Sequence, residues 1–164
     1  MFGCSLRLYI YKNESDAFIF LDGLIHKFKL ENLFGIKNNE LNQKIKEIEY
    51  TINKCCPEVN KHLQKIYLNY DFLIIKWMIT LFSNHMNIKY LFQLWDYMII
   101  FGWKFFKGFV ISIIQYNKDI IIKSSLETIN KNIKNILKTK EFENNFNNII
   151  NKAFEHINKE KEII

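Results

Sequence analysis

The side chains that could bind a metal or act as nucleophiles are few and far apart in this sequence. The four histidines are His26, His62, His85 and His156. None lies four residues from another, the spacing that places two imidazoles on one helical face in many zinc sites. No serine, cysteine or threonine sits in a recognisable nucleophile turn or near a base in the sequence. The sequence therefore predicts no metal, no cofactor and no covalent catalysis.

The three cysteines are Cys4, Cys55 and Cys56. Their number is odd, and the adjacent pair has the spacing of neither a disulfide framework nor a metal site. This favours a reducing, cytoplasmic setting. The apolar N-terminal residues reach Arg7 without a basic segment before it, so they do not resemble a signal peptide.

The formal charge of +6 comes almost entirely from scattered lysines, and Arg7 is the only arginine. Arginine is the residue that proteins favour for bidentate contacts to bases and phosphates. Abundant Ile, Lys, Asn, Phe and Tyr also reflect AT-rich codons, which weakens any inference from charge. We expect a solvated lysine surface and no binding of nucleic acid.

The elements that must position any site are predicted to be helices. Apolar residues make up 49% of the 164 residues, enough for a real core, whereas one proline and five glycines leave few turns for a sheet. Apolar spacing predicts about eight helices in one all-α domain over 1–164, without an internal repeat. They cover about 15–29, 41–55, 57–63, 70–83, 88–101, 103–116, 124–137 and 141–159.

Local signals mark several helix ends. Ser15 is predicted to cap the first helix, whose apolar face carries Phe18 and Leu21. Gly102 is placed to form a left-handed C-terminal cap. Ser124 and Glu127 have the spacing of a capping box.

The stretch KYLFQLWDYMIIFGWKFF, residues 89–106, is too interrupted for a membrane span. A spanning helix needs about 20 mainly apolar residues, but Asp96 and Lys104 fall inside the run and Gly102 divides it. Two packed core helices are expected instead. A membrane protein resting on the apolar residues 97–114 is the weakest alternative, so membrane contact is expected to be peripheral at most.

The tryptophans are predicted to be core anchors, because a buried indole contributes a large apolar area and needs one partner for its N–H. They are Trp77, Trp95 and Trp103. Asp96 needs a partner if it is buried. A partly exposed helix acid is an equally open interpretation, and neither makes Asp96 a catalyst.

An ordered series of motifs resembles the C-terminal half of the TBC domain, the module of GTPase-activating proteins for Rab-type GTPases. The series runs PEVNKHL at 57–63, KWMITLF at 76–82, LWD at 94–96, then a glycine and a Phe-rich helix. The residues that match the family pattern are Pro57, His62, Leu63, Trp77, Phe82, Trp95, Asp96, Gly102 and Phe106. Asp16-Ala17-Phe18 and Asn151 to Phe154 extend the resemblance over about 1–154, followed by a short charged tail.

The resemblance implies an all-α fold, a Rab-type GTPase as partner, and a role in vesicle trafficking at the cytoplasmic side of endomembranes. It implies a structural role for the matching residues, and a hydrogen-bonding role for Asp96. A lysine patch that contacts a GTPase or a membrane surface is the alternative to the expected solvated lysine face.

The departures from the family concern catalysis. The family is implied to use an arginine within Ile-x-x-Asp-x-x-Arg and a glutamine within Tyr-x-Gln. Arg7 has no aspartate three residues before it, and no glutamine has a tyrosine two residues before it. The glutamines are Gln43, Gln64, Gln93 and Gln115. The chain as given is therefore expected to lack both catalytic side chains and to be inactive alone.

Two interpretations remain open at this stage. The chain is the C-terminal part of an activator whose N-terminal half is missing, or it is a non-catalytic helical module that binds a GTPase or another protein. The first predicts an uncovered apolar face, because half a helical domain exposes the surface that packed on its other half. The second predicts a monomer that folds cooperatively by itself.

Overall fold

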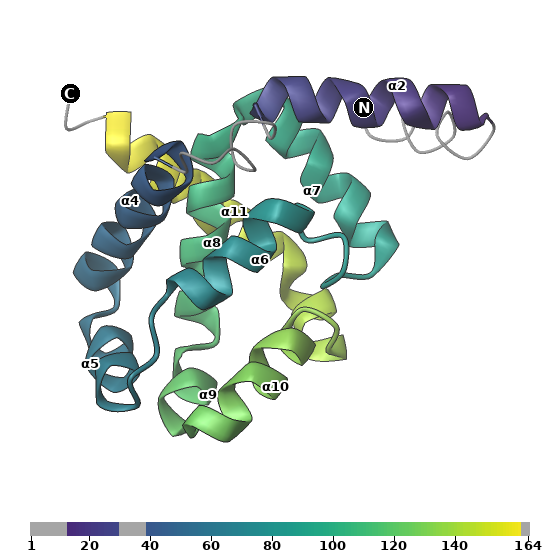
Figure 1. Cartoon of the computed structure of the whole chain (residues 1–164). Helices are drawn as coiled ribbons and strands as arrows, with labels where there is room; N and C mark the ends of the chain where they lie inside the picture. The colour runs from purple at the N-terminus through teal and green to yellow at the C-terminus, as the bar shows by residue number, and fades with distance from the viewer. Residues whose placement is uncertain (1–12, 30–38, 162–164) are drawn as a thin grey trace.

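The computed structural model describes residues 13–29 and 39–161, and every regular element in those ranges is an α-helix (Figure 1). This confirms the all-α prediction. The nine helices of the described residues are α2 (Glu14–Phe28), α4 (Asn39–Cys55), α5 (Pro57–Lys65), α6 (Asp71–Thr80), α7 (Ile88–Phe101), α8 (Trp103–Tyr116), α9 (Lys118–Lys123), α10 (Leu126–Ile136) and α11 (Lys140–Lys161).

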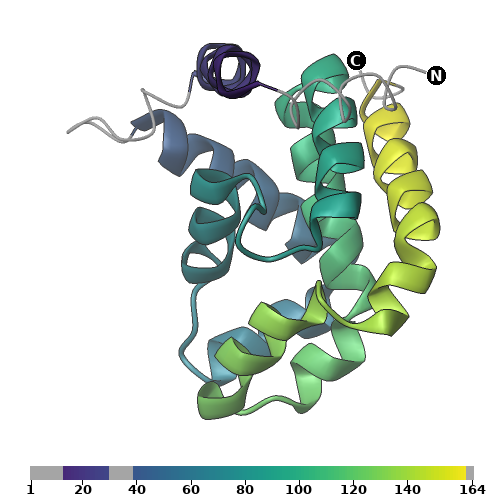
Figure 2. The ribbon, with the colours of Figure 1, turned by 90° about the vertical axis from the view of Figure 1, so that its right-hand side faces the viewer.

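Helix α8 is the centre of the fold. Phe105, Phe106 and all residues from 108 to 114 are buried, as expected for a helix with apolar residues on most sides. Helices α11, α4, α7 and α9 pack around it, α11 along most of its length (Figures 1 and 2). The core therefore forms by covering one apolar helix rather than by closing a symmetric bundle.

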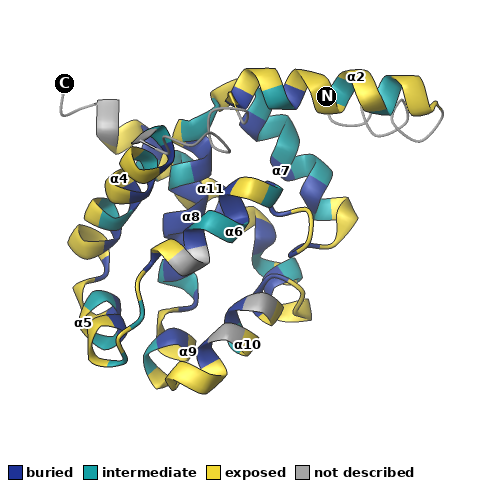
Figure 3. Cartoon of the chain, viewed as in Figure 1, coloured by how far each residue is buried: buried dark blue, intermediate teal, exposed yellow. Residues whose placement is uncertain are grey.

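The predicted apolar faces of α4 and α11 are confirmed. Leu41, Ile45, Ile48 and Ile52 are buried where α4 meets its neighbours. On α11 the buried residues are Phe142, Phe146, Ile149, Ile150, Ala153 and Ile157. Figure 3 shows that α4 exposes its opposite face, and on α11 residues such as Asn151 and Glu155 are exposed.

Helix α2 differs from the prediction in two respects. Its N-cap is Asn13, whose Oδ1 accepts the N–H of Ser15 at 3.1 Å, so Ser15 is not the cap. Leu24 and Phe28 are buried, but Phe18 and Leu21 are 71% and 51% exposed. Only part of the apolar face of α2 packs on the described core, because the helix lies across one end of it (Figure 1).

The capping box before α10 was predicted one residue too early. Ser125 and Thr128 form it: the Ser125 Oγ accepts the Thr128 N–H at 3.3 Å, and the Thr128 Oγ1 accepts the Ser125 N–H at 2.9 Å. Ser124 is buried instead, and its hydroxyl donates to the Ile120 carbonyl at 2.7 Å. The short helix α9, not predicted from the sequence, supplies that carbonyl.

The stretch around Gly102 forms two helices that meet at a corner, as predicted. Among the helices that the structure describes, none combines the length and the apolar character that crossing a bilayer requires.

Candidate functional site

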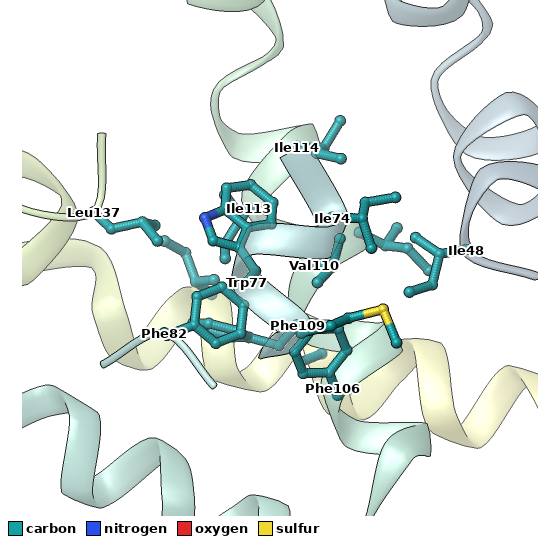
Figure 4. Packing of buried hydrophobic residues seen from close by; sticks show 14 of the residues in the cluster. Ile48, Ile74, Trp77, Phe82, Phe106, Phe109, Val110, Ile113, Ile114 and Leu137 are labelled. Atoms are coloured by element: carbon teal, nitrogen blue, oxygen red, sulfur yellow. The ribbon is translucent and has the colours of Figure 1, made fainter. Parts of the chain in front are cut away.

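Phe82 lies at the centre of the family-like residues. The chain leaves α6 through Leu81 and Phe82, both with positive φ, 44° and 66°. The Phe82 N–H closes the end of α6 by bonding to the Trp77 carbonyl at 3.3 Å. This left-handed turn sends the Phe82 ring inward, where its centroid lies 5.5 Å from that of Trp77, 5.4 Å from that of Phe106 and 5.2 Å from that of Phe109 (Figure 4).

Trp95 connects α7 to the same turn. Its Nε1–H donates to the Leu81 carbonyl at 2.8 Å, and its ring packs against Phe20 of α2 and Phe92. Trp95 is half-buried, and so is Asp96 beside it. The indole therefore stabilises a strained turn whose left-handed residues are not glycines.

Gly102 forms the corner between α7 and α8, but not with the left-handed helical geometry expected from the sequence. Its φ and ψ are 63° and −150°, a region that only glycine occupies readily. The Gly102 N–H bonds to the Met98 carbonyl at 2.7 Å, and its own carbonyl accepts the N–H of Phe105 at 3.1 Å. The same residue thus ends one helix and begins the next, which directs Phe106 into the core.

The earlier family-like residues lie at another part of the fold. Pro57 is the first residue of α5, where its missing N–H is harmless. His62 bonds through Nε2 to the Ser124 carbonyl at 2.8 Å, and since a carbonyl only accepts, Nε2 carries the proton. Leu63 is buried beside it. This group ties α5 to the end of α9.

In the structure, Phe82 thus contacts both Trp77 and Phe106, and Trp95 is attached through the Leu81 carbonyl. Gly102 positions Phe106 from the corner. Pro57, His62 and Leu63 form a second group on α5. These contacts position helices and leave no reacting group at the centre of either set.

The four glutamines do not converge. They lie on α4, α5, α7 and α8, and Gln115 is engaged through Oε1 with His156 Nε2 at 2.9 Å. Gln43 is exposed and donates to Glu47 of its own helix at 3.3 Å. Arg7 lies outside the described residues.

Metal ligation and thiol chemistry find no support in the geometry. Across residues 13–29 and 39–161, histidine, cysteine and acidic side chains do not gather in threes as a metal site requires. Cys55 is exposed and Cys56 is buried. Burial raises the pKa of the Cys56 thiol to about 11, which keeps it protonated and unreactive near neutral pH.

Sequence reasoning missed the positioning roles of two residues, Ser124 and Gly108. The Trp103 indole was expected to need one partner for its N–H, and its Nε1–H donates to the Phe28 carbonyl at 3.2 Å. The Ser124 carbonyl accepts the hydrogen bond from His62, and the missing side chain of Gly108 allows α11 to approach α8. Their signals were weak: one glycine within an apolar helix and one serine beside another.

One comparison with known proteins identifies the family. The model of the Rab-GTPase-TBC domain matches residues 2–122. The chain belongs to the Rab-GTPase-TBC domain family. No curated protein matches it. Membership of the TBC family indicates a function like that of Rab GTPase activators, with a small GTPase as partner.

All nine family-like residues fall inside the segment that matches the TBC domain. The match ends within α9, so α10 and α11 lie beyond it. Because α11 covers most of α8, the folded unit of this TBC family member extends well past the matched residues.

Proposed function

We propose that this chain forms the C-terminal part of a TBC-type regulator that binds a Rab-type GTPase in vesicle trafficking, at the cytoplasmic surface of endomembranes. The match to the Rab-GTPase-TBC domain over residues 2–122 carries the proposal. The packing of Trp77, Phe82 and Phe106 supports it, since residues quoted for the family resemblance meet in one buried cluster.

The chain by itself does not accelerate GTP hydrolysis in this proposal. An arginine finger places a fixed positive charge against the transferring phosphoryl group and contributes roughly 10³ to 10⁵ in rate. Arg7 is the only arginine and lacks the aspartate three residues before it, and no glutamine follows a tyrosine by two positions. The residues named for the family resemblance then support the fold rather than the reaction.

One observation favours a domain with a further N-terminal half over a self-contained helical module. Phe18, Ile19 and Leu21 of α2 are 71%, 67% and 51% exposed. Exposed apolar residues grouped on one helix are typical of surfaces that pack on a partner. We infer that an N-terminal half of the same domain covers this part of α2 in the working protein.

GTPase binding and GTP hydrolysis should be measured separately. The chain is added to a panel of GTP-loaded Rab proteins, complex formation is followed by calorimetry, and phosphate release is followed by fluorescence. We expect binding to at least one member without faster release. Release that is accelerated by the chain but not by its Arg7→Ala variant would contradict catalytic silence, and no binding to any member would contradict the proposed partner.

Light scattering tests whether the exposed apolar residues of α2 make the isolated chain associate. The purified chain is expected to associate, and the double variant Phe18→Ser, Leu21→Ser to be more monodisperse. The matched control is Ile88→Ser, which removes an exposed apolar side chain from a different helix. A monodisperse wild-type chain would favour the alternative, a self-contained binding module without catalytic activity.

A further inference from the structure

A groove runs along α4 where this helix passes the first turns of α8, and the function proposed above does not use it. Its main hollow has a volume of about 790 Å³ and is lined by α4 side chains together with Lys107 of α8. A smaller hollow of about 80 Å³ continues it towards Trp103. Glu47 and Lys107 line both, so the two form one surface, called here the α4–α8 groove.

The charge of the α4–α8 groove is predominantly positive. Lys44, Lys46, Lys104 and Lys107 line it, against a single lining acid, Glu47. Glu40 offsets one of these lysines, since its carboxylate lies 3.5 Å from the Lys44 ammonium. Lys46 in turn lies near Glu49 of the same helix. The four lysines therefore exceed Glu40, Glu47 and Glu49 by one positive charge, and a low-dielectric wall strengthens the potential that this excess produces.

Aromatic rings accompany the lysines. Lys44 Nζ lies 5.3 Å from the centroid of the Trp103 ring, a cation–π contact that holds this ammonium at the wall of the groove. Tyr50, another lining residue, is 71% exposed and presents an open ring face. Asn42 adds an amide that can bond to a peptide backbone. Cations, a ring and an amide on one concave surface suit a ligand that is anionic and extended.

We propose that the α4–α8 groove binds an acidic segment of a protein partner. Its volume exceeds what one phosphate group needs, and the groove is largely open to solvent, which suits an extended chain rather than an enclosed small molecule. A flat lipid surface would match lysines that project from a convex face around an apolar centre, whereas these lysines line a hollow. The proposal does not depend on which GTPase, if any, the chain regulates.

Fluorescence anisotropy with a short fluorescein-labelled peptide of alternating glutamate and glycine tests the proposal. The control peptide has glutamine in place of each glutamate. We expect the glutamate peptide to bind, the glutamine peptide not to bind, and added salt to weaken binding. The double variant Lys46→Glu, Lys104→Glu should raise Kd at least about tenfold, because each change replaces attraction by repulsion.

A matched charge reversal separates the groove from general electrostatics. Lys131→Glu with Lys138→Glu changes the net charge equally at exposed residues of α10 and the turn after it, which do not line the groove. Its Kd should change less than about twofold. Equal weakening by both double variants, or no binding by the wild-type chain, would overturn the proposal.

Two further measurements keep the result decisive. Circular dichroism and a thermal melt establish that the variants fold. If charge reversal perturbs folding, the double variant Lys46→Gln, Lys104→Gln replaces it, and we expect this variant to lose less affinity for the glutamate peptide. Vesicles of phosphatidylserine and phosphatidylcholine are the competing probe. Vesicle binding that depends on Lys46 and Lys104, without peptide binding, would assign the groove to a lipid surface and refute a peptide partner.

Discussion

Gly108 of α8 faces the Ala153 carbonyl of α11 so closely that a Cβ added to Gly108 would lie 2.6 Å from that oxygen. The contact is with backbone, so neither side can relieve the clash by rotating a side chain. The packing of α8 against α11, the most extensive contact between two helices of the described residues, therefore depends on the absence of one methyl group.

Replacing Gly108 by alanine should destabilise the protein by about 1 to 3 kcal/mol, because α8 and α11 must separate to admit the methyl group. The measurement is urea unfolding followed by circular dichroism. The matched control is Gly23→Ala in α2, where a Cβ would meet nothing within 4 Å. There the change should stabilise by up to about 1 kcal/mol through helix propensity. Equal effects at both sites would show that the α8–α11 distance is not constrained.

Gly102 offers a test of backbone conformation alone. A Cβ there would also meet nothing within 4 Å, yet φ is 63° and ψ is −150°. Gly102→Ala should cost about 1 to 3 kcal/mol from backbone strain. Asparagine rescues left-handed helical caps but not this region, so Gly102→Asn should be about as unstable as Gly102→Ala in thermal melts. Clear rescue by asparagine would instead support the cap predicted from the sequence.

Trp95→Phe should remove the hydrogen bond to the Leu81 carbonyl and leave that acceptor without its indole partner. We expect a loss of about 1 to 3 kcal/mol in the free energy of unfolding. Tyr67→Phe is the control, since this side chain is almost fully exposed and losing its hydroxyl should have little effect. If the two variants unfold at the same urea concentration, the indole bond does not stabilise the turn after α6.

The free energy of unfolding should depend on pH through the ionisation of Glu49. Burial, and next the neighbouring Asp71 carboxylate, raise its pKa above the ordinary value. An acid whose pKa is raised by folding disfavours the native state when it is ionised. Its unfavourable contribution is therefore absent below the unfolded pKa of about 4.3 and develops as pH rises through the folded pKa.

Glu49→Gln removes that charge, so the variant should be more stable than the wild type near neutral pH by up to about 1 kcal/mol. The difference should shrink as pH falls towards 4.3. Thermal melts across this range provide the measurement, and Glu155→Gln on the exposed face of α11 is the control. A difference that does not vary with pH would refute ionisation as the cause.

Features specified by neighbouring residues could be predicted from the sequence. The predicted helices 88–101 and 103–116 have the bounds of α7 and α8, because Asn87 and Gly102 mark their ends locally. The buried faces of α4 and α11 also follow from helical spacing. The family resemblance came from motif order, and the match to the Rab-GTPase-TBC domain confirms the family.

Features decided by distant segments could not be predicted. Ser124 and Ser125 can each cap a helix, and the choice depends on the burial of Ser124 beside His62 and Asn132. Helical spacing predicted an apolar face that includes Phe18, but spacing alone does not say what covers it. The bond from Trp95 to a backbone carbonyl likewise leaves no local trace in the sequence.

The pairing of α8 with α11 has a consequence for synthesis on the ribosome. Helix α8 ends at Tyr116, but α11, the helix that covers most of it, has its last buried residue at Ile157. Helix α11 is therefore the last of the core helices to be translated. Until those residues leave the exit tunnel, a strongly apolar helix remains without its largest neighbour. Nascent chains that stall between α9 and α11 should therefore attract chaperones, and chains extended beyond the tunnel should not.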